Sequence, residues 1–260
     1  MDQPALLELF ARAESLPRLP RLGGMARPNG VVILSERFWA FAGVDGSLRE
    51  GEMAQGPSAL RRVPLVRGLL RLGSAISPIV RRDGVVRAGE RRFLIAVLLA
   101  PFALFLLPSQ LQLVVGVLLS VAMVAWLMRG RTLRLHGAEH RAIAAVEQRK
   151  VLSTWSGEAR PSRFAARCGT NFAALVLPVA ALFDSILWSL PAAAVALLAL
   201  SLTMELWVAI EGRTHRFARA FLVPGLLLQR LTTREPRLDE TQLALRAAAS
   251  VLRRELAQPS

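Results

Sequence analysis

Two histidines four residues apart are the feature of this sequence that points most directly to chemistry. They lie in the segment His136-Gly137-Ala138-Glu139-His140. On a helix, residues i and i+4 share one face, so both imidazoles can reach one metal ion. The spelling H-x-x-E-H is also that of the inverted zincin metalloproteases, in which the Glu is the general base. The segment therefore predicts His136 and His140 as metal ligands and Glu139 as a catalytic base, with a purely structural helix as the alternative.

A third protein ligand is usual in a catalytic zinc site, and it must come from outside this helix. Glu147 is excluded because seven residues beyond His140 correspond to about 10 Å of helical rise. Cys168 and Glu205 are the candidates, since the topology predicted below brings both toward the membrane depth of the histidines. An acidic residue inside a membrane helix indicates a functional site. Two alternatives stay open, namely an inert buried thiol at Cys168 and a pairing of Glu205 with an arginine.

Two long uncharged runs predict membrane helices. Residues 93–128 contain no ionisable side chain and are interrupted near Pro108, and residues 168–204 contain Asp184 as their only charge. A bilayer core of roughly 30 Å requires about 20 apolar residues per helix, so each run is interpreted as a hairpin of two spans. The expected fold class is mainly α, a polytopic helical membrane protein with four spans. These spans are predicted at about residues 93–107, 111–128, 171–187 and 192–210.

The arginines predict the orientation of these spans. Fifteen Arg precede Phe93, eight Arg and Lys150 lie between the two runs, nine Arg follow Ile210, and neither hairpin turn contains Lys or Arg. Basic residues gather in short cytoplasmic loops. We therefore expect a multi-pass inner-membrane protein with both termini and the central loop in the cytosol.

The composition narrows the class of protein further. The formal net charge is +14, yet 53% of the residues are hydrophobic, and the single cysteine excludes an intrachain disulfide framework. Attraction to anionic lipid headgroups accounts for the charge. A nucleic-acid partner is not expected, because the arginines are spread over three segments without interleaved aromatic residues.

The remaining segments predict a cytosolic layer. Residues 1–22 form an N-terminal extension that is either an amphipathic helix or poorly ordered, and it precedes one membrane domain at residues 23–257. The β-branched and aromatic stretches at 31–34 and 37–43, with the turn signal Asp45-Gly46, predict a small β-hairpin. Residues 61–79 and 239–256 read as amphipathic helices.

Several motifs together resemble a known family. HGAEH at 136–140, RCGTNF at 167–172, VPLVRGLL at 63–70, TMEL at 203–206 and PGLLLQRLTTREP at 224–236 are similar to the YqhQ-like family of bacterial integral membrane proteins. The resemblance covers roughly residues 23–255 and implies an uncharacterised domain described as a predicted metal-dependent enzyme. Two positions depart from the family pattern, since relatives commonly have Glu at Asn29 and His at Ala165.

Two functions from different classes follow from these observations. The first is a membrane protein that binds a divalent metal ion, with zinc favoured, at the cytosolic face through His136, His140 and either Cys168 or Glu205, and that acts as a zinc-dependent hydrolase through Glu139. The second is a non-catalytic scaffold or assembly factor that has lost part of the metal site and binds a protein partner or a second copy of itself. A transporter is less favoured because four short spans offer few polar groups for a translocation path.

Overall fold

The computed structural model of the chain describes residues 2–54, 59–86, 88–104, 106–127, 129, 131–187, 189–210 and 216–257. The chain divides into two compact units. The first unit comprises Met1–Met53, Leu127–Ala165 and Gln229–Ser260, and the second comprises Ala54–Trp126 and Ala166–Leu228. Both predicted helical hairpins are therefore inserted between segments of the first unit.

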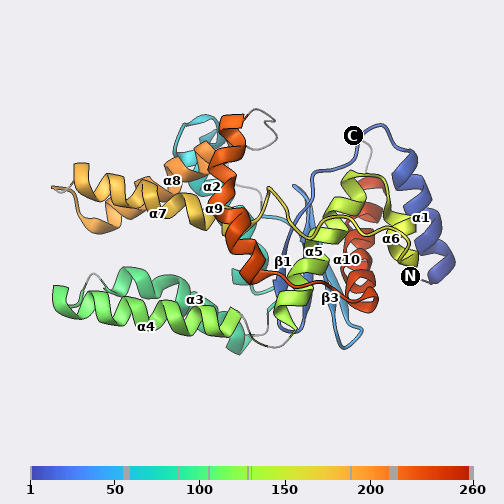
Figure 1. Cartoon of the computed structure of the whole chain (residues 1–260), viewed down its shortest axis with the longest axis horizontal. Coiled ribbons are helices and arrows are strands. Elements are labelled where there is room, and N and C mark those ends of the chain that lie inside the picture. The colour runs from blue at the N-terminus through green and yellow to red at the C-terminus, as the bar shows by residue number, and fades with distance from the viewer. Residues whose placement is uncertain are drawn as a thin grey trace. The chain divides into compact units, whose positions relative to one another are not determined.

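The first unit is built on an antiparallel sheet of four strands in the order β1-β2-β3-β4 (Figure 1). The strands are β1 (Gly23–Arg27), β2 (Gly30–Leu34), β3 (Phe38–Gly43) and β4 (Leu48–Glu52). Side chains alternate between the two faces of a strand, and Val31, Ile33, Ala40 and Ala42 face the hydrophobic core.

The predicted hairpin is thus only the centre of the sheet. The β2–β3 pair and the turn at Asp45-Gly46 lie where the sequence places them, with Gly46 at a φ of 83°. The prediction of a single hairpin is wrong in extent, because β1 pairs with β2 and β4 pairs with β3. These two edge strands read GGMAR and LREGE, so they lack the apolar alternation that marks a strand in a sequence.

Helices α5 (Thr132–Glu147) and α10 (Leu238–Ala257) pack against each other and against the sheet. Their buried apolar side chains recur at helical spacing and form the core with β2 and β3. Arg134 on α5 donates to Glu240 on α10 at 2.9 Å, which ties the start of α10 to α5. The two helices are thus fixed in the core of the first unit, and α5 carries both histidines.

The N-terminal segment belongs to this core. Helix α1 (Gln3–Ser15) and the short helix α6 (Val151–Ser156) pack on α10 and on each other. Phe10 is fully buried, with its ring centroid 5.8 Å from that of Trp155. Of the two readings of residues 1–22, the structure has the helix, and its apolar face is anchored in the first unit.

The second unit consists of helices. They are the 3-10 helix η1 (Leu60–Arg62), α2 (Val66–Val80), α3 (Ala88–Leu104), α4 (Ser109–Leu127), α7 (Gly169–Ile186), α8 (Ala192–Ile210) and α9 (Arg216–Thr232), whose last turn lies in the first unit. Helix α8 packs against α7 and α2. Gly68 of α2 allows this close packing, because a Cβ there would lie 2.7 Å from the carbonyl oxygen of Ser201.

Two helices of the second unit are long and apolar enough to cross a membrane within the described residues, α7 and α8. They coincide with the third and fourth predicted spans to within two residues at each end. In the first predicted hairpin, α3 and α4 are separate helices with a break before Ser109, and membrane crossing by these two helices stays a prediction. The mainly helical fold is confirmed, and the count of four spans is not.

Candidate metal centre

The histidines project from α5, and two features of the sequence hold the neighbouring backbone against this helix. Gly137 lies where a Cβ would come within 2.2 Å of the carbonyl oxygen of Arg234, so only glycine lets the segment after α9 approach. The Arg234 amide donates to the carbonyl oxygen of Leu133 at 2.8 Å. Gly137 of HGAEH therefore packs directly against the backbone of Arg234 in the TTREP stretch.

Each imidazole donates through Nδ1 to a backbone carbonyl. The Nδ1 of His136 lies 2.8 Å from the carbonyl oxygen of Thr232, and the Nδ1 of His140 lies 2.6 Å from that of Arg163. A carbonyl only accepts, so both rings carry their proton on Nδ1 and the lone pair on Nε2. The two ring centroids are 4.5 Å apart. This arrangement, with one nitrogen oriented by a carbonyl and the other presented, is typical of metal-ligating histidines.

The Nε2 atom of His140 is a buried acceptor without a hydrogen-bond partner among the described residues. His140 is 1% exposed, so bulk water does not reach this atom. Such a group costs about 1–3 kcal/mol when nothing satisfies it. A bound cation would satisfy it.

Burial keeps both rings in the form that binds metals. Desolvation lowers the pKa of His136, and desolvation together with the neighbouring His136 lowers the pKa of His140 to about 4. Both imidazoles are therefore neutral at pH 7, and a metal ion would not have to displace a proton from either ring.

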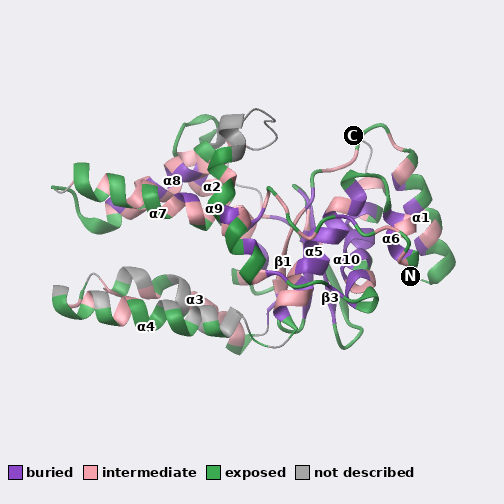
Figure 2. Ribbon diagram, in the orientation of Figure 1, coloured by how far each residue is buried: buried purple, intermediate pink, exposed green. Residues whose placement is uncertain are grey.

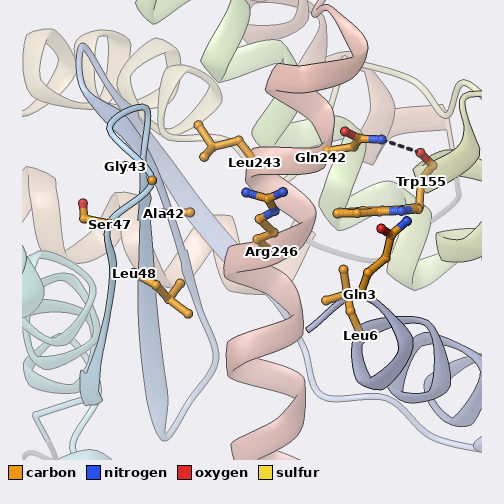
Figure 3. Close-up of a pocket in the computed structure, with 11 residues that line it drawn as sticks. Gln3, Leu6, Ala42, Gly43, Ser47, Leu48, Trp155, Gln242, Leu243 and Arg246 are labelled. Carbon is orange, nitrogen blue, oxygen red and sulfur yellow. Dashed lines mark hydrogen bonds between the residues drawn. The ribbon is translucent and has the colours of Figure 1, made fainter. Parts of the chain in front are cut away.

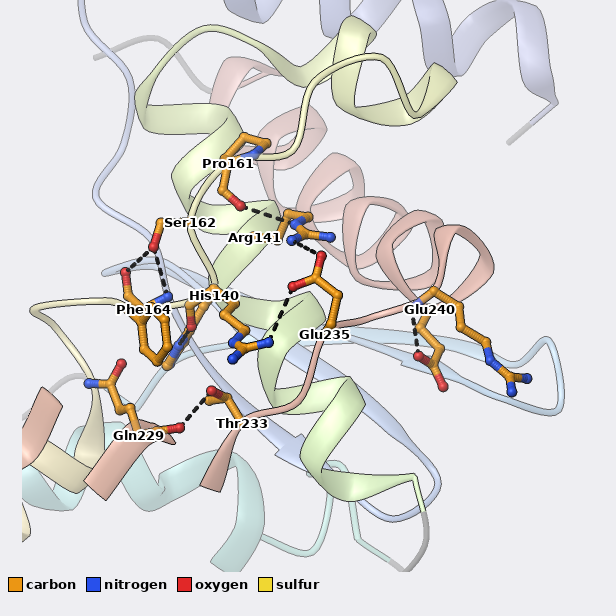
Figure 4. A network of polar contacts seen from close by, with 11 residues as sticks. His140, Arg141, Pro161, Ser162, Phe164, Gln229, Thr233, Glu235 and Glu240 are labelled. Carbon is orange, nitrogen blue, oxygen red and sulfur yellow. Dashed lines mark hydrogen bonds and ion pairs between the residues drawn. The ribbon is translucent and has the colours of Figure 1, made fainter. Parts of the chain in front are cut away.

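A polar network fixes the loop that accepts from His140 (Figure 4). Arg141 is buried and donates to the carbonyl oxygen of Pro161 at 3.0 Å and to Glu235 at 2.6 Å. The fully buried side chain of Gln229 accepts from the amide of Ala165 at 2.9 Å and donates to its carbonyl at 2.8 Å. Both ends of the 161–165 loop are thereby anchored.

The side chain of Glu139 lies against β1. A Cβ on Gly24 would lie 2.9 Å from its Oε1, so the glycine makes room for the carboxyl group. Burial raises the pKa of Glu139 to about 8, against the opposing effect of a hydrogen bond from the backbone of Ala26. The carboxyl is thus held under the sheet edge, and its role as a base stays a prediction.

Cys168 and Glu205 belong to the second unit. Cys168 caps the N-terminus of α7, where the hydroxyl of Thr170 donates to its Sγ at 3.1 Å. Donors and a helix N-terminus favour the thiolate, which is the form that binds metals. Glu205 forms a two-pronged ion pair with Arg67 of α2, with Nε–Oε1 and Nη2–Oε2 distances of 2.7 and 2.6 Å. The structure thus gives Glu205 the arginine partner that the sequence analysis considered as its alternative.

Chain connectivity limits how far Cys168 can lie from the anchored loop. Ala165 is held by Gln229, and Cys168 follows three residues later, a span of at most roughly 10 Å. His136 and His140 of the first unit and Cys168 of the second each offer one ligand atom of a kind that binds metal ions, so Cys168 stays the candidate for the third ligand.

The residues that orient the histidines were missed by the sequence analysis. Thr232 and Arg163 act through backbone carbonyls, which carry no signal in a sequence. Gln229 had a signal, since it is a polar residue within the apolar run of the PGLLLQRLTTREP motif. Of the two positions that depart from the family pattern, Asn29 is exposed in the turn between β1 and β2, and Ala165 is the residue that Gln229 holds.

The first unit, an antiparallel sheet packed with helices, thus carries the two histidines, and the second unit contains two helices long and apolar enough to cross a membrane. Residues 107–254 match the family described as "Protein of unknown function (DUF1385)", and the chain belongs to this family. This is consistent with the YqhQ-like resemblance. No curated protein and no solved structure matched the chain.

Proposed function

We propose that the protein binds one divalent metal ion, zinc in the first instance, through His136, His140 and Cys168. The observation that carries the proposal is the buried Nε2 of His140, which has no partner among the described residues although its ring is oriented by the carbonyl of Arg163. An orphaned acceptor beside a second neutral imidazole is costly in a structural helix and useful in a metal site.

The donor set selects the kind of ion. Two imidazoles and one thiolate suit zinc, and they are poor ligands for magnesium or calcium, which prefer oxygen. Three protein ligands would leave the fourth position of a tetrahedral zinc open, as in catalytic sites. Bound there, zinc would act as a Lewis acid and lower the pKa of a coordinated water.

A zinc-dependent hydrolase is the finer form of this proposal, with Glu139 as its base. The carboxyl group approaches Gly24 and the backbone of Ala26, so this role requires the side chain to turn from β1 toward the histidines. Glu139→Gln in the zinc-loaded protein tests the role. If Glu139 is the base, the variant should lose hydrolysis and retain zinc. If Glu139 serves only in packing, the variant should lose stability with or without zinc.

The alternative function is a non-catalytic scaffold. It is favoured by Ala165, which offers only a methyl group where relatives commonly have His and which serves as the backbone partner of Gln229. A scaffold predicts a stable protein partner that co-purifies equally with wild type and with the His136→Ala/His140→Ala double variant. A metal-dependent function predicts that the two behave differently.

We further propose that the protein resides in a bacterial inner membrane with both termini cytosolic and its basic residues against anionic headgroups. The two candidate membrane helices and the arginine-free hairpin turns support this topology. Reporter fusions placed after Pro108 and after Ser189 should behave as periplasmic. A cytosolic signal at either turn would contradict the topology.

Metal content tests the central proposal. The full chain, purified in detergent, is expected to hold about one zinc ion per molecule by mass spectrometry, and the His136→Ala/His140→Ala variant is expected to hold none. Glu147→Ala, at the end of the same helix but too far along it for the site, is the matched control and should retain the metal. A wild-type protein that binds no metal would overturn the proposal.

A further inference from the structure

A hollow lies in the first unit, away from the metal centre (Figure 3). The residues that form it do not belong to the histidine pair or to the polar network that orients the histidines. Its volume is about 440 Å³, within the usual range for small-molecule sites. The walls come from α1, the adjoining ends of β3 and β4 with the turn between them, α6 and α10. All of them belong to the first unit.

Arg246 is the charged side chain of this hollow. It extends from α10 between the β3–β4 turn and Trp155, and its guanidinium carbon lies 5.9 Å from the centroid of the indole ring (Figure 3). The lining contains no Asp or Glu, and Arg246 forms no ion pair within the described part of the chain. A guanidinium held over a ring keeps its in-plane N–H groups available, and these match a carboxylate in a bidentate manner.

The other arginines near the end of α10 behave differently. Arg253 pairs with Glu50, and Arg254 pairs with Glu52 while its guanidinium lies 4.3 Å from the Phe38 ring centroid. On the same helix, Arg246 faces the hollow and forms no ion pair with a carboxylate among the described residues. This asymmetry indicates a place for an anion that the protein does not itself supply.

The rest of the lining suits a flat apolar body. Leu6 and Leu243 contribute side chains from α1 and α10, and Leu48, 46% exposed, contributes one from β4. Trp155 also lines the hollow and is held in place by Phe10 and by the hydrogen bond from Gln242 to its carbonyl oxygen at 3.0 Å. A ring lying among these leucines would stack near Trp155 and direct its substituent at Arg246.

We infer that this hollow is a binding site for a small aromatic carboxylate, with Arg246 binding the carboxylate and the leucines and Trp155 enclosing the ring. A single guanidinium without a cluster of backbone donors matches one negative charge, which favours a carboxylate over a phosphate ester. Because α1 forms one wall, the bound molecule would also tie the N-terminal helix to α10. The inference is independent of the metal proposal, since the two sites share no residue.

Ligand-observed fluorine NMR on the full chain in lipid nanodiscs tests the inference, with empty nanodiscs as the blank. The probe is a fluorinated naphthoate, and the corresponding neutral naphthamide reports the contribution of the charge. Wild type is expected to bind the naphthoate saturably and about tenfold more tightly than the naphthamide. Arg246→Gln is expected to raise the Kd of the naphthoate about tenfold and to leave that of the naphthamide unchanged.

Two further variants separate the site from general charge and from folding. Arg12→Gln removes the same charge from an exposed position on α1 and should leave the Kd within about twofold. Leu48→Trp fills the rim of the hollow from an exposed position and should weaken binding of both probes. Equal naphthoate affinity in wild type and Arg246→Gln, or no saturable binding above empty nanodiscs, would overturn the inference.

Discussion

The two units use the same apolar residue types in opposite ways. In the first unit, α10 is interrupted by charged residues, yet ten of its 20 residues are buried, and the apolar ones among them join one continuous core. In the second unit, α7 is almost uninterrupted by charge, yet only Asn171 and Leu175 are buried. Figure 2 shows the same contrast, with buried residues gathered on α5 and α10 and exposed residues along α7.

The membrane location proposed for the second unit accounts for this difference. Leucines and valines of α4, α7 and α8 are exposed, among them Leu118 at 62% and Leu177 at 71%. In water such a surface would be strongly unfavourable, whereas lipid chains would cover it. Within the second unit, small residues and polar contacts join the helices instead, as with Gly68 against Ser201 and Arg67 with Glu205.

Removing a core side chain of the first unit should change the free energy of unfolding most. Phe10→Ala should lower the free energy of unfolding by about 3–5 kcal/mol, because it deletes a fully buried ring that anchors α1 against Trp155. Leu177→Ala, in the second unit, should change it by less than about 0.5 kcal/mol, because that side chain has little protein around it. Denaturant unfolding of the two variants in the same detergent measures both. Equal losses of unfolding free energy in the two variants would contradict the difference in packing between the units.

A smaller effect is expected where the first unit holds the loop of the metal centre. Gln229→Leu removes both hydrogen bonds that the Gln229 side chain forms with the backbone of Ala165, so it should cost about 1–3 kcal/mol and weaken zinc binding about 10–100-fold. Thermal unfolding and a competitive zinc titration provide the readouts. Gln148→Leu, at an exposed position after α5, is the control. Unchanged zinc affinity in Gln229→Leu would show that the loop does not support the site.

The smallest effect depends on pH and involves the β4–α10 contact. Burial acts to raise the pKa of Glu50, but hydrogen bonds from Ser250 and the charge of Arg253 outweigh it and lower the pKa below its ordinary value of 4.5. A lowered folded-state pKa contributes stability above the unfolded value, and this contribution is lost as the pH falls through the folded value. Because the carboxyl is partly exposed and screened, Glu50→Gln should cost only about 0.5–1 kcal/mol at pH 7 and nothing in acid. Unfolding measured from pH 7 downward tests this, and a cost that does not shrink as the pH falls would contradict it.

The sequence predicted those parts of the fold whose pattern is local. The uncharged runs around Pro108 and around Ser189 placed the helices of both hairpins, and the β-branched and aromatic residues of 31–34 and 37–43 placed the two central strands. The i, i+4 spacing of His136 and His140 placed them side by side on α5. These features depend on periodicity within one segment, which a sequence shows directly.

What the sequence did not predict depends on contacts between distant segments. The edge strands β1 and β4 are fixed by pairing with β2 and β3. The turn of Glu139 toward β1 depends on Gly24, more than a hundred residues earlier. Likewise, Gln229 meets Ala165 only once the first unit has assembled from three separate segments.

X-ray absorption spectroscopy of the zinc-loaded full chain tests the central claim most directly, because it reports the atoms bound to the metal. We expect two imidazole nitrogens at about 2.0 Å and one sulfur at about 2.3 Å from the zinc. The sulfur should be lost in Cys168→Ser, and both nitrogens should be lost in His136→Ala/His140→Ala. A shell of oxygen atoms alone, or a spectrum unchanged by these substitutions, would contradict it.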